Sequence, residues 1–560
     1  MINIWCKNDG KRHQVELGTT LGEMAAKWHI KGPVLAALVD HELKDLSYQV
    51  IVSQEVEFLD YGAADGRRCY IRSLCFVLQA VVRELYPDKI LAIHHSLPSG
   101  LYCELLEPFK AEDGRRPVLF LTDEEIETIR QKMQKIIDDD IPFTKKRMLA
   151  EEAEAIFDGQ NQPHKAALLR STGVFTTNVY YLGKTADSFH GPLVPSSGLL
   201  QTFGLVGFNQ GMCLQLPQMA DSGRLMPIRR QSKIAASLKE YSDWCDIEGV
   251  RGIGNLNKAI DEGRAVQLIN LAEALHERKY AAIADQIWQR RGEVKIVFIA
   301  GPSSSGKTST SLRLALQCKV LGLNPKVLEL DNYFHNREDT PKDENGNYDF
   351  EALGAMDLEL LGTQLNDLLA GKEVEIPKFD FKAGCRRYEG KKLRLEEKDI
   401  LIMEGIHALN PEMVPGVDQT RIFRVYASAL TSLSIDENNN ISTSDNRLLR
   451  RMIRDNRVRG ISPEDTILRW SSVRRGEIRG IFPFQENADA IFNSALVFEL
   501  PLLKYYAEPL LRRISQASPA YPEAVRLLKF LSYIFPLRPD EIAAIPPTSI
   551  MREFIGGQTL

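Results

Sequence analysis

The 560-residue chain lacks the features that would place it outside the cell or in a membrane. Its eight cysteines are scattered without a C-x-x-C pair, which suits a reducing compartment rather than a disulfide framework or a zinc ribbon. No apolar run is long enough to cross a bilayer, since the most apolar segment, 74–82, is broken by Gln79. The first residues also lack a basic-then-apolar signal pattern. We therefore expect a soluble, cytoplasmic protein with no membrane partner.

The sequence also lacks an excess of charge of either sign. A formal net charge of -5 argues against a protein that coats nucleic acid by bulk electrostatics, although it allows a local basic patch. With 44% hydrophobic and 26% charged residues, the composition excludes disordered and fibrous classes. A chain of this length is too long for one hydrophobic core, so roughly three or four domains are expected.

A phosphate-loop motif lies near the middle of the chain. Residues 301–308 read Gly-Pro-Ser-Ser-Ser-Gly-Lys-Thr and fit G-x-x-x-x-G-K-[ST]. The apolar run 294–300 predicts a buried parallel strand before the motif, and 309–321 predicts an amphipathic helix after it. Glycines let backbone N–H groups turn toward phosphate oxygens, and the helix adds its positive end. We expect these residues to bind the nucleotide: Gly301, Ser303, Ser304, Ser305, Gly306, Lys307, Thr308 and Ser309.

Two residues of this motif have distinct expected roles. Lys307 would neutralise charge between the outer phosphates, and Thr308 would place its hydroxyl on a magnesium ion. A plain glycine-serine turn is the alternative interpretation of the motif. The strand before it and the helix after it favour nucleotide binding over that alternative.

Two later strands end in carboxylates. The apolar segment 326–330 leads into Asp331, and 399–403 leads into Glu404. Because the carboxyl ends of strands line the ligand crevice of an open α/β sheet, both acids are expected beside the phosphate loop. Asp331 could accept a proton from an acceptor hydroxyl or hold the magnesium shell, and Glu404 could organise the magnesium ion and its waters. An aspartate after a strand is also a common turn or helix cap.

Arginines gather downstream of these acids. Their planar, multi-donor guanidinium groups suit the charge that spreads over a migrating phosphoryl group. Some of them are expected only to pair with Asp445 and Asp455 on a solvated face. The first group within this stretch comprises Arg447, Arg450, Arg451, Arg454, Arg457 and Arg459.

The C-terminal half resembles the uridine kinase and phosphoribulokinase family. The matching segments occur in the family's order: 301–308, 331–334, 348–349, 376–381, 403–406 and 454–460. The resemblance implies transfer of the terminal phosphate of ATP or GTP, with Mg²⁺, to the 5′-hydroxyl of uridine or cytidine. It also implies Asp331 as the catalytic base, Asp349 as the acceptor of a ribose hydroxyl, Glu404 as a magnesium organiser, and Arg454 and Arg459 in a mobile lid.

The segment that would read the nucleobase departs from that family. In uridine-cytidine kinases a tyrosine and a histidine contact the pyrimidine, and Phe379 and Gly384 occupy those places here. Because polar contacts give strong discrimination between related substrates, the acceptor is left open between a nucleoside and a sugar phosphate or other small alcohol. Arg386 or Cys385 is a candidate substitute for the lost polar groups. The expected substrate contacts are Asp349, Tyr333, Phe379 and Arg386.

The N-terminal part resembles threonyl-tRNA synthetases. Residues 1–62 show the strand and helix order of a ubiquitin-like roll, as in the small TGS domain of those enzymes. Residues 63–230 resemble their second domain, which hydrolyses mischarged tRNA, through segments that include 78–87, 121–125 and 187–198. This similarity keeps open an alternative function, a nucleotide-switched regulator that binds tRNA or another RNA. The N-terminal half is accordingly a candidate site for tRNA or a regulatory ligand.

The editing residues of that second domain are missing. Two histidines, a cysteine and a later histidine align with Phe76, Ala80, Phe189 and Leu193. None of these four side chains can bind a metal through imidazole or thiolate, or move a proton. The nearby histidines and cysteine do not restore a metal-ligand spacing: His94, His95, His190 and Cys75. We expect neither editing activity nor a metal in this region.

The sequence thus predicts an α/β protein of five units. These are a ubiquitin-like α+β domain (1–62), a synthetase-like α+β module (63–230), a helical connector (231–291), a P-loop kinase domain with a mainly parallel sheet (292–503), and a C-terminal helical segment without chemistry (504–560). A last sheet strand is expected at 490–500. A basic cluster at 229–233 is interpreted as a solvated face. A homo-oligomer is expected, although the sequence does not set the number of subunits.

Overall fold

The computed structural model describes residues 1–560 except 220, 230, 343–345, 347 and 381. Arg230 of the predicted basic cluster and Phe381 at the end of a family-like segment lie outside the described residues. Across the described part of the chain, no helix is long and apolar enough to cross a bilayer.

The first domain is a mixed sheet with one helix. The strand order is β2-β1-β5-β3-β4; β1 and β5 are parallel and the other neighbours are antiparallel. This arrangement is ubiquitin-like, as the sequence predicts, and it has its own apolar core around Ile4, Leu21 and Val56. The elements are β1 (Ile2–Cys6), β2 (Lys11–Val15), α1 (Leu21–Lys27), β3 (Ala36–Val39), β4 (Glu42–Lys44) and β5 (Gln54–Leu59).

The second domain surrounds a long, largely buried helix, α2 (Ala64–Leu85). Both of its sheets are antiparallel: one has the order β12-β13-β7-β6 with β8 beside β7, and the other has the order β11-β10-β9. The remaining elements are β6 (Ile90–Leu97), β7 (Gly100–Leu106), β8 (Val118–Leu119), α3 (Asp123–Asp138), β9 (Thr144–Leu149), α4 (Ala150–Asp158), α5 (Pro163–Thr172), β10 (Thr176–Leu182), β11 (Thr185–Asp187), β12 (Gly204–Phe208) and β13 (Gly211–Gln215).

Three helices connect this module to the kinase-like domain: α6 (Ser232–Ile247), α7 (Ile253–Asp261) and α8 (Ala265–Gln289). The long helix α8 packs against the kinase sheet, where Tyr280 stacks on Phe492 with ring centroids 4.3 Å apart. Its apolar positions follow the helical spacing of the sequence, and they join the same core cluster as the central strand of that sheet. Helix α8 thus joins the expected connector region to the core of the kinase-like domain.

The kinase-like domain contains five parallel strands in the order β15-β18-β14-β19-β20. Every residue of the central strand β14 is buried, as its continuous apolar sequence predicts. The elements are β14 (Ile296–Ala300), α9 (Lys307–Val320), β15 (Asn324–Glu329), α10 (Leu358–Leu369), the antiparallel hairpin β16 (Val374–Asp380) and β17 (Cys385–Leu393), β18 (Asp399–Glu404), β19 (Ile422–Ser428), α11 (Thr443–Arg454), α12 (Pro463–Gly480) and β20 (Ala490–Asn493).

The last strand is shorter than the sequence predicts. β20 ends at Asn493, and the expected strand to residue 500 is wrong because the chain turns away from the sheet. Ser494 donates its hydroxyl hydrogen to the carbonyl of Ser305, 2.6 Å away, and a helix begins at Glu499. The apolar residues after Ser494 are buried in this turn and helix instead of in a strand.

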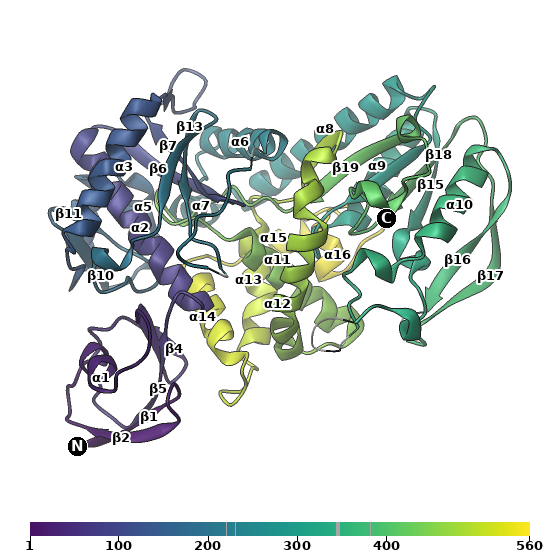
Figure 1. Ribbon diagram of the computed structural model, residues 1–560. Helices are drawn as coiled ribbons and strands as arrows, with labels where there is room; N and C mark the ends of the chain where they lie inside the picture. The colour runs from purple at the N-terminus through teal and green to yellow at the C-terminus, as the bar shows by residue number, and fades with distance from the viewer. Residues whose placement is uncertain (220, 230, 343–345, 347, 381) are drawn as a thin grey trace.

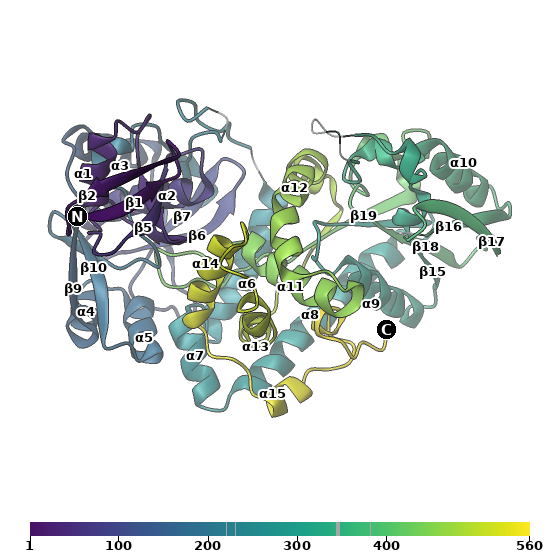
Figure 2. The same ribbon diagram turned by 90° about the horizontal axis from the view of Figure 1, so that it is seen from below.

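The C-terminal helices lie between the two halves of the molecule in both views (Figures 1 and 2). Arg526 of α14 pairs with Asp445 of α11 at 2.8 Å, and Glu523 of α14 lies 3.4 Å from Arg68 of α2. The segment therefore contacts both the synthetase-like module and the kinase-like domain. Its elements are α13 (Glu499–Leu511), α14 (Tyr521–Ser532), α15 (Pro539–Ala543) and α16 (Met551–Ile555).

Candidate active site

The phosphate loop follows the central strand β14 and turns sharply into α9. At Gly301 a side chain is excluded, because an added Cβ would lie 2.0 Å from the carbonyl oxygen of Ala427. Ser304 and Gly306 have φ values of +57° and +83°, in the left-handed region. These two residues turn the chain so that α9 begins at Lys307 with the N–H groups of its first turn facing the loop.

Buried arginines of α11 support the loop from behind. Arg447 donates to the carbonyl of Ser303 at 3.0 Å and forms a fork with Glu477. Arg450 pairs in the same way with Glu499 and lies 3.5 Å from the carbonyl of Ser304. The arginines are 1% and 0% exposed. Arg447 and Arg450 therefore support the loop. From the sequence they could not be distinguished from the predicted lid arginines Arg454 and Arg459.

The two predicted acids meet the motif from neighbouring strand ends. Thr308 donates its hydroxyl hydrogen to Glu404 Oε1 at 2.8 Å. Burial raises the pKa of Glu404 to about 7, against the opposing effect of Lys307. Burial also raises the pKa of Asp331, which Lys307 and Arg459 lower in part. The structure therefore brings together Lys307, Thr308, Asp331 and Glu404.

The predicted lid arginines share one carboxylate. Arg454 lies 2.9 Å and Arg459 lies 3.4 Å from Asp455, which is 1% exposed. Arg459 is half exposed and close enough to Asp331 to lower its pKa. Arg451 donates to the hydroxyl of Ser303 at 2.8 Å. Cationic groups thus lie along one side of the loop.

The region of the expected substrate contacts Asp349 and Arg386 carries several carboxylates. Asp349 accepts from Arg479 at 2.8 Å, and Arg386 donates to Asp357 at the same distance. Glu351, which the sequence analysis did not single out, is also in the site: burial raises its pKa, while Arg451 and Lys307 lower it. Its position two residues after Asp349 is the signal that could have identified it.

Two predicted substrate contacts are not at the surface of the site. Tyr333 is 1% exposed and donates its hydroxyl hydrogen to Gln364 Oε1 at 2.9 Å. Phe379 is 7% exposed, and its ring packs edge-on against Phe334 with centroids 5.8 Å apart. Both belong to the apolar core of this region, because burying an aromatic ring is more favourable than exposing it to a polar ligand.

The donor set fits a magnesium ion that is shared with phosphate. Within the described residues, no group of three or more His, Cys, Asp or Glu side chains could hold a metal by itself. Mg²⁺ is typically bound by one or two carboxylates, substrate phosphates and retained waters. The Thr308 hydroxyl, hydrogen-bonded to the buried carboxylate of Glu404, would supply the protein's part of such a set.

The positions aligned with synthetase editing residues are apolar and packed together. Phe76 and Leu193 are 0% and 1% exposed, and Phe76 contacts the ring of Phe189 edge-on at 5.4 Å. Burial raises the pKa of the nearby Cys75 thiol to about 12 and lowers the pKa of His190 far below its usual value. A thiol that stays protonated and an imidazole that stays neutral do not form an acid-base centre.

A loop of the kinase-like domain, residues 429–442, is buried against the synthetase-like module. Glu437 accepts from the backbone N–H of His164 at 2.6 Å, at the start of α5. Asn438 donates to Asp187 at 3.1 Å, and Asn439 to the carbonyl of Ser188 at 3.3 Å. The side chains of this loop therefore bind the region next to Phe189 of the synthetase-like module.

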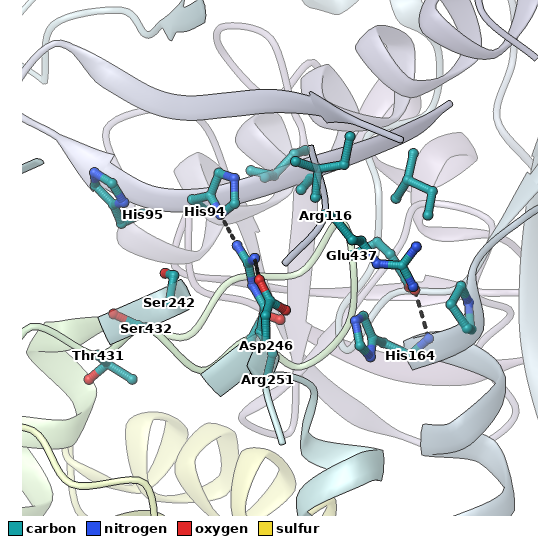
Figure 3. A pocket seen from close by; sticks show the side chains of 16 residues that line it. His94, His95, Arg116, His164, Ser242, Asp246, Arg251, Thr431, Ser432 and Glu437 are labelled. Carbon is teal, nitrogen blue, oxygen red and sulfur yellow. Dashed lines mark hydrogen bonds and ion pairs between the residues drawn. The ribbon is translucent and has the colours of Figure 1, made fainter. Parts of the chain in front are cut away.

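A pocket with both polar and apolar lining residues lies at the same junction (Figure 3). Arg251 of the connector reaches between His94 of β6 and Asp246 of α6. Ser242 and Ser432 also line the pocket. Module, connector and kinase loop all contribute, so the pocket is part of the interface that joins the halves.

Comparison with known proteins separates the chain into the same two parts. Residues 296–499 match the model of the Phosphoribulokinase / Uridine kinase family. A threonine–tRNA ligase of Desulforamulus reducens is 31% identical over 209 residues, which are 37% of this chain and 31% of that ligase. The ligase of Thermotoga neapolitana is 29% identical over 200 residues, which are 35% of this chain and 29% of that ligase. The chain spans less than a third of the length of these curated relatives.

Solved kinase structures are similar to part of the chain. The structure of a possible uridine kinase from Bacillus stearothermophilus is 18% identical, covers 36% of this chain and 89% of its own, and has a TM-score of 0.24. The D-glycerate 3-kinase of Cryptococcus neoformans is 13% identical, with coverages of 38% and 89% and a TM-score of 0.26. By the family match, residues 296–499 form a domain of the phosphoribulokinase / uridine kinase family, placed after an N-terminal part similar to threonine–tRNA ligases.

Proposed function

We propose that the protein is a nucleoside kinase that transfers the terminal phosphate of ATP or GTP to the 5′-hydroxyl of uridine or cytidine. The observation that carries this proposal is the meeting of Lys307, the Thr308–Glu404 pair and Asp331 in a domain of a kinase family. Phosphoryl transfer depends mainly on positioning and electrostatic stabilisation, which these charged groups can supply.

Asp331 is the proposed base. Its buried carboxylate has a raised pKa, so it holds a proton more readily than an exposed aspartate. As the acceptor oxygen bonds to the terminal phosphorus, the bond from that phosphorus to the bridging oxygen of the nucleotide breaks, and the acceptor proton passes to Asp331. General-base assistance of this kind contributes about a hundred- to ten-thousand-fold in rate.

The other groups act on the phosphates. Lys307 neutralises charge on the outer phosphates. Arg454 at the end of α11 and Arg459 in the turn after it stabilise the negative charge of the migrating phosphoryl group. A magnesium ion held by the Thr308 hydroxyl and through Glu404 would supply further positive charge to the phosphate oxygens. The hydrogen bond between the Thr308 hydroxyl and the Glu404 carboxylate already holds both groups in place for such an ion.

The charge of the acceptor side supports a neutral acceptor over a sugar phosphate. Asp331, Asp349 and Glu351 place carboxylates around the expected position of the acceptor, and Arg479 and Arg386 are already paired with Asp349 and Asp357. A phosphorylated acceptor would bring like charge into this region. Asp349 could accept a hydrogen bond from a ribose hydroxyl.

A panel of acceptors tests the proposal. The full chain is incubated with Mg²⁺ and labelled ATP or GTP, together with pyrimidine nucleosides, purine nucleosides, sugar phosphates or glycerate. We expect label in uridine or cytidine monophosphate. No turnover of any pyrimidine nucleoside would refute the assignment, and turnover of a sugar phosphate would replace it with the alternative acceptor class.

A nucleotide-switched RNA-binding regulator is the second candidate, and the similarity to threonine–tRNA ligases favours it. Burial of residues 436–439 against the module argues against entry of a tRNA end at that place. A gel shift with tRNA at physiological salt, with and without ATP, tests this candidate. Absence of a shift under both conditions would remove its support.

A further inference from the structure

The C-terminal segment (residues 549–558) lies against the phosphate loop. Ser309 donates its hydroxyl hydrogen to Glu553 Oε2 at 2.6 Å, and its backbone N–H points to the same oxygen at 3.4 Å. Gln558 donates its side-chain N–H to Ser309 Oγ at 2.9 Å. Ile550 covers Gly306, where an added Cβ would lie 2.3 Å from its Cδ1. The end of the chain thus contacts the last residues of the nucleotide-binding motif.

The N–H that Glu553 accepts belongs to the first turn of α9. N–H groups in this turn have no partner within the helix, and the positive end of the helix dipole attracts anions there. In a phosphate loop these groups bind the phosphates of the nucleotide. The carboxylate of Glu553 therefore uses a donor that a phosphate oxygen would also use.

Glu553 also lies beside Arg454 at the end of α11 and Arg457 just after it. Its Oε1 is 3.9 Å from Arg454 Nη1, and Arg457 donates to the backbone carbonyls of Glu553 and Phe554 at 3.0 and 3.1 Å. Arg454 is one of the two arginines proposed to face the migrating phosphate. The same carboxylate thus engages a phosphate-binding N–H and a cation of the proposed catalytic set.

The segment is held in place by apolar packing. Ile550, Met551 and Phe554 are all 0% exposed and belong to the core that contains the central kinase strand. The Glu553 side chain is 14% exposed. A nucleotide can therefore displace the carboxylate by a change of side-chain rotamer, without extracting the helix from the core.

We propose that Glu553 is a built-in competitor of the donor nucleotide, which must displace its carboxylate from Ser309 and Arg454 before the phosphates can bind. This inference rests on the proposed kinase function and adds a control on its donor site. A carboxylate beside the phosphates would also repel them. The chain's own C-terminal segment thereby sets the donor affinity below that of the phosphate loop alone.

The test is donor binding to the full chain with Glu553→Gln, measured by calorimetry with ATP or GTP and Mg²⁺ and without an acceptor. Glutamine keeps the size of the side chain and removes its charge. We expect the dissociation constant to fall about three- to tenfold, since a charged hydrogen bond and a partly screened ion pair are lost from the competing state. Glu508→Gln is the matched control, because Glu508 is a partly exposed residue of α13 that pairs with Arg512.

Thermal unfolding of each variant establishes that it is folded, and Glu553→Ala replaces Glu553→Gln if the latter is not. Unchanged or weaker donor binding by a folded Glu553 variant would overturn the inference while leaving the kinase proposal intact. If neither the unmodified chain nor the variant binds ATP or GTP, the kinase proposal fails and the competitor role fails with it. Tighter binding that Glu508→Gln does not reproduce supports the role of Glu553.

Discussion

The sequence predicts the role of Lys307 more directly than that of Asp331. The role of Lys307 follows from the motif, because its neighbours fix the loop geometry wherever this strand, loop and helix occur. The assignment of Asp331 needed the order of strands, and the structure places it where Lys307 lowers its pKa. Glu351 and Glu553 reach the site from loops and a distant helix, and no local spacing predicts such contacts.

The first prediction concerns these two residues. Lys307→Ala should weaken donor binding and abolish transfer, since the main cation at the phosphates is lost. Asp331→Asn should retain donor binding and lower kcat by at least about a hundredfold, the lower range for a general base. Steady-state kinetics and nucleotide titration measure both, with Lys319→Ala on the exposed face of α9 as the control. Near-full turnover by Asp331→Asn would contradict the base assignment.

The second prediction concerns the support of the loop. Arg450→Ala leaves Glu499, 1% exposed, without its guanidinium partner. Removing one member of a buried pair costs about 3–5 kcal/mol, so the free energy of unfolding should fall by that amount. Denaturant titration measures this loss, and Arg512→Ala in an exposed pair should cost less than about 1 kcal/mol. Equal losses in the two variants would show that Arg450 is not a structural support.

At the scale of single elements, strands were easier to predict than the function of helices. The run 296–300 is apolar without interruption and short, which is typical of a buried parallel strand. Helix α11 carries arginines on one face and leucines on the other, which is also typical of a solvated lid helix. The sequence of α11 does not show that Arg447 and Arg450 are buried. Glu477 and Glu499, from two other helices, pair with them and offset the desolvation cost of their guanidinium groups.

Helix α8 gives a prediction of pH dependence. His276 is 1% exposed, donates from Nε2 to the carbonyl of Ala495 at 3.2 Å, and has its pKa lowered by burial to about 3. Because the unfolded chain binds the proton near pH 6.5, this group's contribution to stability is complete above pH 6.5 and is lost as the pH falls toward 3. The loss is at most about 1.4 kcal/mol per pH unit.

The measurement is the slope of the free energy of unfolding against pH between 6.5 and 4. His276→Gln should reduce this slope by about one bound proton, whatever it does to stability at neutral pH. An unchanged slope in His276→Gln would show that the folded chain can accommodate the protonated imidazole.

At the scale of the whole molecule, resemblance to two protein families predicts the domains of the chain. The contacts that join these domains are seen only in the structure. Residues 436–439 are 2–6% exposed although all four are polar. Nothing in their sequence predicts burial, since such residues normally lie in solvated turns. Their burial is offset by hydrogen bonds of two kinds. Glu437, Asn438 and Asn439 bond across the interface to the start of α5, Asp187 and Ser188, and Asp436 accepts from the backbone N–H groups of Asn438 and Asn439 within the loop.

This interface predicts that the two halves unfold together. Loop 429–442 connects β19 to α11, so displacement of the module would break the hydrogen bonds of this loop across the interface and disturb the arginines that support the phosphate loop. α14 adds ion pairs to both sides through Glu523 and Arg526. Calorimetry of the full chain should therefore show one transition whose van't Hoff and calorimetric enthalpies agree.

Substitution of Glu437 tests whether this interface couples the unfolding of the two halves. Glu437→Ala removes the acceptor at the start of α5 and should lower the midpoint of that transition, or split it so that the module unfolds first. Glu412→Ala, in an exposed turn of the kinase-like domain, should leave the transition single. ATP should shift the whole transition of the unmodified chain upward, because a ligand that binds one part of a cooperative unit stabilises all of it. Two transitions in the unmodified chain, with only one shifted by ATP, would mean that the module and the kinase-like domain fold independently.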